Sequence, residues 1–145
     1  MKISYGRQFI DSKDKKFVVK SLSGELITQG NNILKFEKEL KKYFSSKYAA
    51  VVSSGTGAMH LVALALGWKK NDLILMSPIT FLSTANIVDH LGAKLDFVDI
   101  DKYTYNICPE KLEKKIKLLK NHKLRAVVAT DFAGLPCDWK KLNFL

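Results

Sequence analysis

A run of hydroxyl and glycine residues, Ser53-Ser54-Gly55-Thr56-Gly57, follows an apolar stretch and opens a helical one. Unpaired N–H groups at a helix N-terminus bind phosphate, and glycine lets the backbone approach a ligand closely. The run contains neither a Walker loop nor a Gly-x-Gly-x-x-Gly fingerprint. Two interpretations stay open: Ser54, Gly55 and Thr56 form a phosphate-binding turn, or they only cap a helix.

Four other residues whose side chains could take part in binding or catalysis follow predicted strands. Phe81 lies in the loop of residues 77–86, where its ring either covers the face of a planar ligand or belongs to the core. Asp99 and Asp101 are two residues apart beside a tyrosine-rich turn, which favours capping over metal binding or acid–base chemistry. Asp131 follows a later strand, in residues 129–134, and is the better functional candidate.

Histidine and cysteine give no further site. His60, His90 and His122 have no convergent partners in the sequence pattern, so we expect each to be structural or solvated. Cys108 and Cys137 lie far apart without a Cys-x-x-Cys spacing, which predicts ordinary reduced thiols and argues against a zinc site or a disulfide framework.

The elements that carry these residues alternate regularly. Apolar periodicity and Gly or Pro punctuation predict helices over residues 11–22, 32–45, 56–66 and 81–91 and from residue 109 onward, and strands over residues 48–53, 73–76, 94–98 and 126–130. A loop of residues 26–30 separates the first two helices. Alternation of strands and helices predicts an α/β fold with a mostly parallel sheet, and ligands bind beyond the carboxyl ends of such strands.

Composition narrows the class of protein. The 145 residues are 47% hydrophobic and 26% charged, as in ordinary globular domains. The net charge of +10 results from 24 basic and 14 acidic residues. Only Arg7 and Arg125 are arginines, and this small number of arginines argues against nucleic-acid recognition. No apolar run is long enough for a membrane span or a signal peptide, so we expect a cytoplasmic protein with no membrane partner. The apolar pattern from Trp139 stops abruptly at Leu145, which predicts a truncated sequence.

Five ordered segments carry a family resemblance. In sequence they are LITQG, VSSGT, SPITF, FVDID and TYNI, at residues 26–30, 52–56, 77–81, 97–101 and 104–107. Together they resemble the N-terminal part of the DegT/DnrJ/EryC1/StrS nucleotide-sugar aminotransferases. The resemblance implies the large domain of a fold-type I, aspartate-aminotransferase-like enzyme, with residues 1–46 as an N-terminal helical segment and residues 47–145 as strand–helix units.

The resemblance also implies roles for single residues. Gly55 and Thr56, with Ser54 beside them, match the turn that binds the phosphate of pyridoxal 5'-phosphate, and Phe81 matches the aromatic residue that stacks on its ring. Asp131 falls at the cofactor site. The loop of Thr28, Gln29 and Gly30 lies on the sugar-nucleotide side.

The same resemblance implies the reaction. An aspartate at position 131 followed by Phe-Ala-Gly resembles the branch that aminates a UDP-4-keto-6-deoxy sugar on the route to pseudaminic acid. A homodimer and glutamate as the amino donor are implied as well. The family's Schiff-base lysine and the aspartate that pairs with the pyridine nitrogen both fall beyond Leu145, so we expect the 145-residue piece to be inactive by itself.

Two alternatives from other classes stay open at this point. One is a non-catalytic α/β module that binds phosphate or another anion at the turn of residues 54–56. The other is a basic domain that binds nucleic acid through its lysines.

Overall fold

The structure is a computed structural model that describes residues 6–119 and 123–145. The chain forms two compact units, residues 1–51 and residues 52–145, and each is described by itself. His122 lies outside the described residues.

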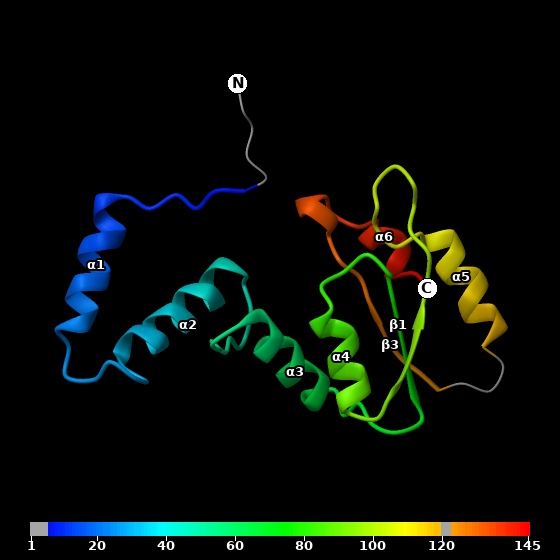
Figure 1. Ribbon diagram of the computed structural model, residues 1–145, viewed down its shortest axis with the longest axis horizontal. Helices are drawn as coiled ribbons and strands as arrows, with labels where there is room; N and C mark the ends of the chain where they lie inside the picture. Colours follow the sequence, from blue (N-terminus) through cyan, green and yellow to red (C-terminus); the bar gives the residue numbers. More distant parts are fainter. Residues whose placement is uncertain (1–5, 120–122) are drawn as a thin grey trace. The chain divides into compact units, whose positions relative to one another are not determined.

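The first unit contains two helices, α1 (Ser12–Leu22) and α2 (Asn31–Tyr43) (Figure 1). Asp11 starts α1 with a capping box, in which its side chain accepts from the N–H of Asp14 and the Asp14 side chain accepts from the N–H of Asp11. Both helices match the predicted ones to within one or two residues at each end. No described residue of this unit is buried, so neither helix has a closed core of its own.

The second unit is an α/β sandwich. Its strands are β1 (Asp72–Met76), β2 (Lys94–Phe97) and β3 (Lys123–Val128), and they form a parallel sheet in the order β2-β1-β3. Its helices are α3 (Gly55–Ala65), α4 (Ser83–His90), α5 (Pro109–Leu118), the short 3-10 turn η1 (Phe132–Gly134) and α6 (Trp139–Leu142). The parallel sheet and the α/β class are therefore confirmed.

Helices cover both faces of the central strand, which explains why every residue of β1 is buried. Ile74 and Met76 point to one face and pack with residues of α3 and α4, including Ala63 and Val88. Leu73 and Leu75 point to the opposite face and pack in a second cluster, which contains residues of α5 and of the C-terminal segment. Figure 1 shows α4 and α5 on opposite sides of the sheet.

One predicted strand is absent. Residues 48–53 are irregular, although their apolar character suits a strand. A strand needs a neighbour to satisfy its backbone, and among the described residues no strand pairs with this segment. The N–H of Val51 instead donates to the Glu37 carboxylate at 3.0 Å.

Two elements begin at other residues than predicted. Residues 126–130 were expected to form the last strand, but β3 begins at Lys123, where it pairs with Asp72 of β1, and ends at Val128. The first residue of β3 is thus set by its partner rather than by apolar character. The helix expected from residue 81 begins at Ser83, which leaves Phe81 in the loop.

Within residues 6–119 and 123–145, no helix combines the length and the apolar character that crossing a membrane requires.

Candidate functional site

The carboxyl ends of β1 and β3 carry two loops that are joined by a hydrogen bond. The two hydroxyl groups of Thr80 and Thr130 lie 2.9 Å apart. Phe81 follows Thr80 and Asp131 follows Thr130, so both candidate residues come to the same edge of the parallel sheet. This is the edge at which open α/β sheets bind ligands.

The N-terminus of α3 has a well-formed cap. Ser54 has extended backbone angles, and its hydroxyl accepts from the N–H of Gly57 at 3.1 Å. The capping interpretation of Ser54 is therefore confirmed. Capping does not compete with anion binding, because the first N–H groups of a helix have no partner inside the helix.

Gly55 leaves the approach to this helix end open. A Cβ atom built on Gly55 would meet no atom within 4 Å, and its backbone needs no positive φ. The glycine is thus required neither by packing nor by a left-handed turn. Open space beside Gly55 leaves room for a ligand to approach the helix N-terminus, the part of a helix that binds phosphate groups.

A cavity of about 300 Å³ lies between α3 and α4. Thr56 and His60 line it from α3, and Ser83 and His90 line it from α4. Thr56 therefore lies near the start of α4, which begins two residues after Phe81. The structure thus brings the predicted phosphate turn and the Phe81 loop into one region.

His60 and His90 contact each other, contrary to the expectation that they would have no partners. Their rings meet edge to face with centroids 5.5 Å apart. The two residues are 30 positions apart in sequence, and only the side-by-side packing of α3 and α4 brings them together. Among the described residues no group of three or more metal-ligating side chains forms.

Phe81 is 74% exposed, so the interpretation of Phe81 as a core residue is wrong. The physical reason is its position before α4, in a loop that the sheet does not cover. An exposed ring at the ligand edge of a sheet is available to cover the face of a planar molecule.

Asp131 is exposed, and a backbone contact fixes its carboxylate. Oδ1 accepts from the N–H of Cys137 at 2.8 Å. This hydrogen bond is the main reason why the pKa of Asp131 is lowered, so its carboxylate is charged at neutral pH. The buried Cys137 thiol donates to the carbonyl of Thr130 at 3.3 Å. Burial first, and the neighbouring Asp131 second, raise the pKa of Cys137 to about 11.

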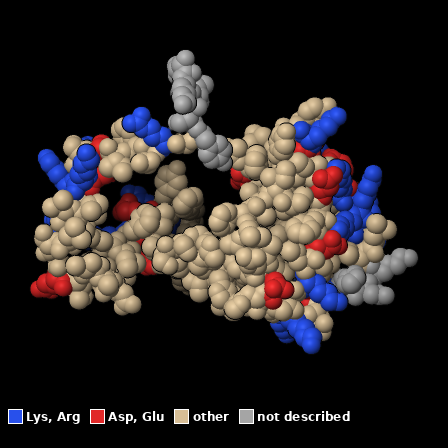
Figure 2. All heavy atoms as spheres, viewed as in Figure 1, with Lys and Arg blue, Asp and Glu red and all other residues tan. Residues whose placement is uncertain are grey.

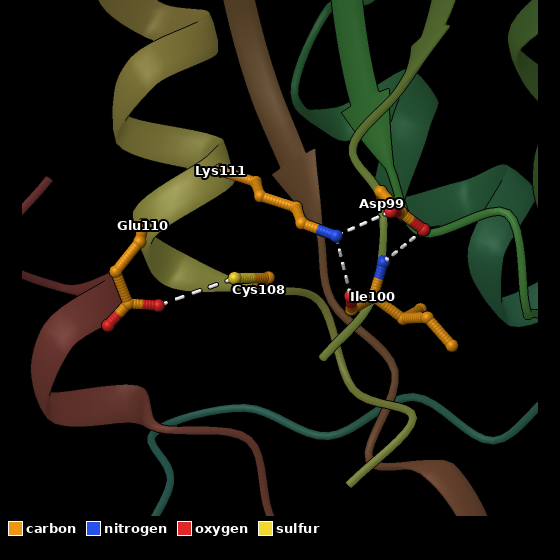
Figure 3. Close-up of polar contacts among 5 residues, drawn as sticks. All are labelled: Asp99, Ile100, Cys108, Glu110 and Lys111. Carbon is orange, nitrogen blue, oxygen red and sulfur yellow. Dashed lines mark hydrogen bonds and ion pairs between the residues drawn. The ribbon is translucent and has the colours of Figure 1, made fainter. Parts of the chain in front are cut away.

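Asp99 and Asp101 stabilise local turns and an ion pair, as expected from the capping interpretation. The Asp99 carboxylate accepts from the Ile100 N–H at 2.9 Å and from the Lys111 ammonium at 2.5 Å (Figure 3). The hydrogen bond from Lys111 is the main cause of the lowered pKa of Asp99. Asp101 Oδ1 accepts from the N–H groups of Tyr103 and Thr104 at 3.0 and 2.9 Å. Both side chains are thus occupied by turn and ion-pair contacts.

The loop of Thr28, Gln29 and Gly30 belongs to the first unit. Gln29 and Gly30 line a cavity of about 410 Å³ together with Lys20 and Lys35, whereas Thr28 is exposed and is not among its lining residues. Gly30 is required here, because a Cβ atom would lie 2.7 Å from the Leu26 carbonyl oxygen. The cavity therefore combines a fixed turn with two basic side chains and one acidic side chain, that of Glu25.

Sequence reasoning missed three residues at the sheet edge: Thr80, Thr130 and Asn106. Thr80 and Thr130 stand directly before the predicted residues Phe81 and Asp131, and the parallel pairing of β1 and β3 was the signal that could have joined them. Asn106 hydrogen-bonds to the backbone on both sides of η1. It lies in the TYNI segment and had no assigned role.

Known proteins resemble the chain over nearly its whole length. The profile of the DegT/DnrJ/EryC1/StrS aminotransferase family matches residues 8–145. A UDP-4-amino-4,6-dideoxy-N-acetyl-beta-L-altrosamine transaminase from Campylobacter jejuni is 40% identical over 144 residues, which are 99% of this chain and 37% of that protein. The PseC aminotransferase of Helicobacter pylori, involved in the biosynthesis of pseudoaminic acid, is 30% identical with a TM-score of 0.83 and covers 97% of this chain and 37% of its own.

A candidate sugar aminotransferase from Streptococcus pneumoniae, solved in a PLP form, supports the fold alone. It is 22% identical with a TM-score of 0.84 and covers 98% of this chain and 35% of its own. The chain spans just over a third of the length of the curated relatives it matches.

Proposed function

The chain belongs to the DegT/DnrJ/EryC1/StrS aminotransferase family, and we propose that the whole protein is a pyridoxal-phosphate-dependent transaminase acting on the C4 keto group of a UDP-4-keto-6-deoxy sugar. The observation that carries the proposal is the open N-terminus of α3, where Gly55 leaves room before unpaired backbone N–H groups. It stands in the same region as the exposed Phe81 loop.

The phosphate is assigned to Ser54, Gly55 and Thr56. The N–H groups of Gly55 and Thr56 donate to it, and the positive end of the α3 dipole favours its charge. The Ser54 hydroxyl already accepts from Gly57 but keeps its own proton, which it can donate to a phosphate oxygen. The Thr56 side chain is exposed at the same helix end and provides a further hydroxyl.

The ring of the cofactor is assigned to Phe81 and Asp131. Phe81 covers one face, and the Asp131 carboxylate, held ionised by Cys137, offers an acceptor at the same sheet edge. Bound pyridoxal phosphate supplies the electron sink that lets an amino group move between a donor and a keto sugar. No lysine of this chain matches the family's catalytic one, so the proposal assigns that residue to the remaining length of the whole protein.

The substrate is assigned from the relatives and from the first unit. The Campylobacter jejuni relatives are transaminases of a UDP-linked amino-dideoxy sugar, which supports a pseudaminic-acid-type substrate. Gln29 and Gly30 lie in a cavity lined by Lys20, Lys35 and Glu25, so the net charge of its lining is positive. This charge suits the diphosphate of such a substrate, and Thr28 completes that loop. Glutamate as amino donor, a homodimer and a cytoplasmic location complete the proposal.

No observation favours nucleic-acid binding. On α5, three of the lysines are engaged: Lys111 with Asp99, Lys115 with Asp96 and Lys117 with Glu113. Figure 2 shows basic and acidic side chains interspersed on the part of the molecule that carries α5, rather than one continuous basic patch. Paired, mixed charge is poorly suited to a phosphate backbone.

An amino-transfer assay tests the proposal. The full-length protein is incubated with pyridoxal phosphate, glutamate and a UDP-4-keto-6-deoxy sugar, and the 4-amino sugar is detected by mass spectrometry. We expect turnover that requires both the cofactor and the amino donor. Absence of product with UDP-linked keto sugars, together with stoichiometric cofactor binding, would contradict the proposed substrate class, and absence of cofactor binding would contradict the proposed reaction.

A further inference from the structure

We propose that Asn106 is a positioning residue that fixes the turn carrying Asp131 and so sets where the Asp131 carboxylate stands at the sheet edge. The cofactor part of this inference rests on the proposed function. The turn itself is described by contacts that do not depend on that function.

Asn106 is only 4% exposed, and both ends of its amide are used. Its Oδ1 atom accepts from the N–H of Phe132 at 2.9 Å, and its Nδ2 atom donates to the carbonyl of Leu135 at 2.9 Å. One buried side chain thus joins the two ends of η1. A buried amide with both groups paired has a single favourable orientation.

The turn that it holds has an uncommon backbone. Ala133 and Gly134 have φ angles of 51° and 81°, so two successive residues are left-handed, and the first of them is not glycine. Non-glycine residues adopt this region only when surrounding contacts impose it. The amide of Asn106 supplies such a contact on each side of the two residues.

The segment that presents Asn106 is itself constrained. The carbonyl of Asn106 accepts from the Asp101 N–H at 2.9 Å, and Ile107 forms an isolated antiparallel bridge with Ile100. Tyr105 has a φ of 60°, and its ring packs against Phe132 with centroids 5.8 Å apart. Asn106 is therefore a fixed support for the turn rather than a mobile side chain.

Asp131 directly precedes this turn, and its side chain hydrogen-bonds to the backbone that follows the turn. Its carboxylate accepts from the N–H of Cys137, two residues beyond Leu135. If the amide of Asn106 is lost, the Phe132 N–H and the Leu135 carbonyl lose their partner, and the turn between Asp131 and Cys137 can relax. The hydrogen bond that fixes the carboxylate is then weakened.

The test uses two variants. N106L keeps a side chain of similar volume but removes the two hydrogen bonds, and N106A removes the hydrogen bonds and most of the side-chain volume. V88A is the control, because Val88 is as deeply buried but packs in the cluster on the opposite face of the sheet. The carboxyl carbon of Asp131 is titrated by NMR in the protein labelled at aspartate. In both Asn106 variants we expect the Asp131 pKa to rise toward its ordinary value of 3.8, whereas V88A lowers the melting temperature without moving that pKa.

An unchanged Asp131 pKa in a folded Asn106 variant would overturn the inference. A second measurement needs no variant: in the wild-type protein, the Phe132 amide should exchange with solvent at least tenfold more slowly than that of exposed Lys140, and equal rates would overturn the inference as well. Pyridoxal phosphate affinity of D131N separates the two proposals. An affinity of D131N equal to that of the wild type would show that Asp131 does not contact the cofactor. A raised Asp131 pKa in the Asn106 variants would still show that Asn106 fixes the turn.

Discussion

Phe81 is the residue at which sequence reasoning left two interpretations and the structure removed one. A phenylalanine is usually buried, yet this ring is 74% exposed, directly after Thr80, whose hydroxyl group hydrogen-bonds to that of Thr130. Periodicity cannot show this, because exposure depends on where α4 begins. Our proposal is that the cofactor covers this ring in the whole protein.

We predict that F81A weakens pyridoxal phosphate binding by the full-length protein by roughly 0.5–1.5 kcal/mol, the usual worth of an aromatic pair beyond buried area. Cofactor titration followed by absorbance measures it. Tyr103, which is 79% exposed in another turn, provides the matched control Y103A. Equal affinities for F81A and Y103A would show that the Phe81 ring does not contact the cofactor.

Cys137 should be unreactive. With its pKa raised to about 11, only about one thiol in a thousand is ionised at pH 8, against roughly a quarter for an ordinary cysteine of pKa about 8.5. We therefore expect alkylation at pH 8 to be roughly two-hundredfold slower than for a free cysteine, since the thiolate is the nucleophile. D131N should speed it modestly, because Asp131 is the second cause of the shift. Rapid alkylation of wild-type Cys137, located by mass spectrometry, would disprove this environment.

At the scale of single elements, the start of α3 depends on its cap. The Ser54 hydroxyl pairs with the Gly57 N–H, and loss of an N-cap side chain typically costs about 1 kcal/mol. We predict that S54A lowers the free energy of unfolding by about that amount in urea denaturation. S83A is the control, because α4 has no side-chain cap. A loss no greater in S54A than in S83A would contradict the role of this cap.

An ion pair joins helix α6 to helix α5, and we expect its contribution to stability to depend on pH. The Lys141 ammonium lies 2.8 Å from the Glu110 carboxylate, and this hydrogen bond is the main cause that lowers the pKa of Glu110 from 4.5 to about 2. Because the folded pKa is the lower one, the stabilisation is present above pH 4.5 and is lost as the pH falls toward 2.

We expect the melting temperature of E110Q to lie below that of the wild type at pH 6 and to converge with it near pH 2. The effect is small, because both side chains are largely exposed. E113Q, which removes the Glu113–Lys117 pair inside α5, controls for loss of one surface pair. A wild-type minus E110Q difference that stays constant from pH 6 to pH 2 would contradict the assigned pKa.

At the scale of the molecule, local signals predicted most elements, and pairing decided the rest. Asp11 and Pro109 mark helix starts in the sequence and do so in the structure. Residues 48–53 show the limit of predicting strands from local sequence. A strand forms only beside a partner strand, and the sequence of this segment alone does not tell whether a partner is present.

The candidate site was predictable only in part. Gly55, Phe81 and Asp131 could be selected from the sequence by residue type and by their positions at strand ends and at a helix start, and their roles in cofactor binding are proposals. Asn106 could not be selected in this way, because its role depends on reaching a turn 26 residues later in the chain. The Thr80–Thr130 contact spans 50 residues and likewise exists only once β1 and β3 pair.

The central claim is that the N-terminus of α3 binds the phosphate of the cofactor, and a binding titration of G55V tests it most directly. Gly6 is the matched control, because a Cβ atom there also meets nothing within 4 Å. We predict that the full-length G55V protein loses at least tenfold in pyridoxal phosphate affinity at an unchanged melting temperature, while G6V binds like the wild type. Wild-type affinity in a folded G55V protein would contradict the account.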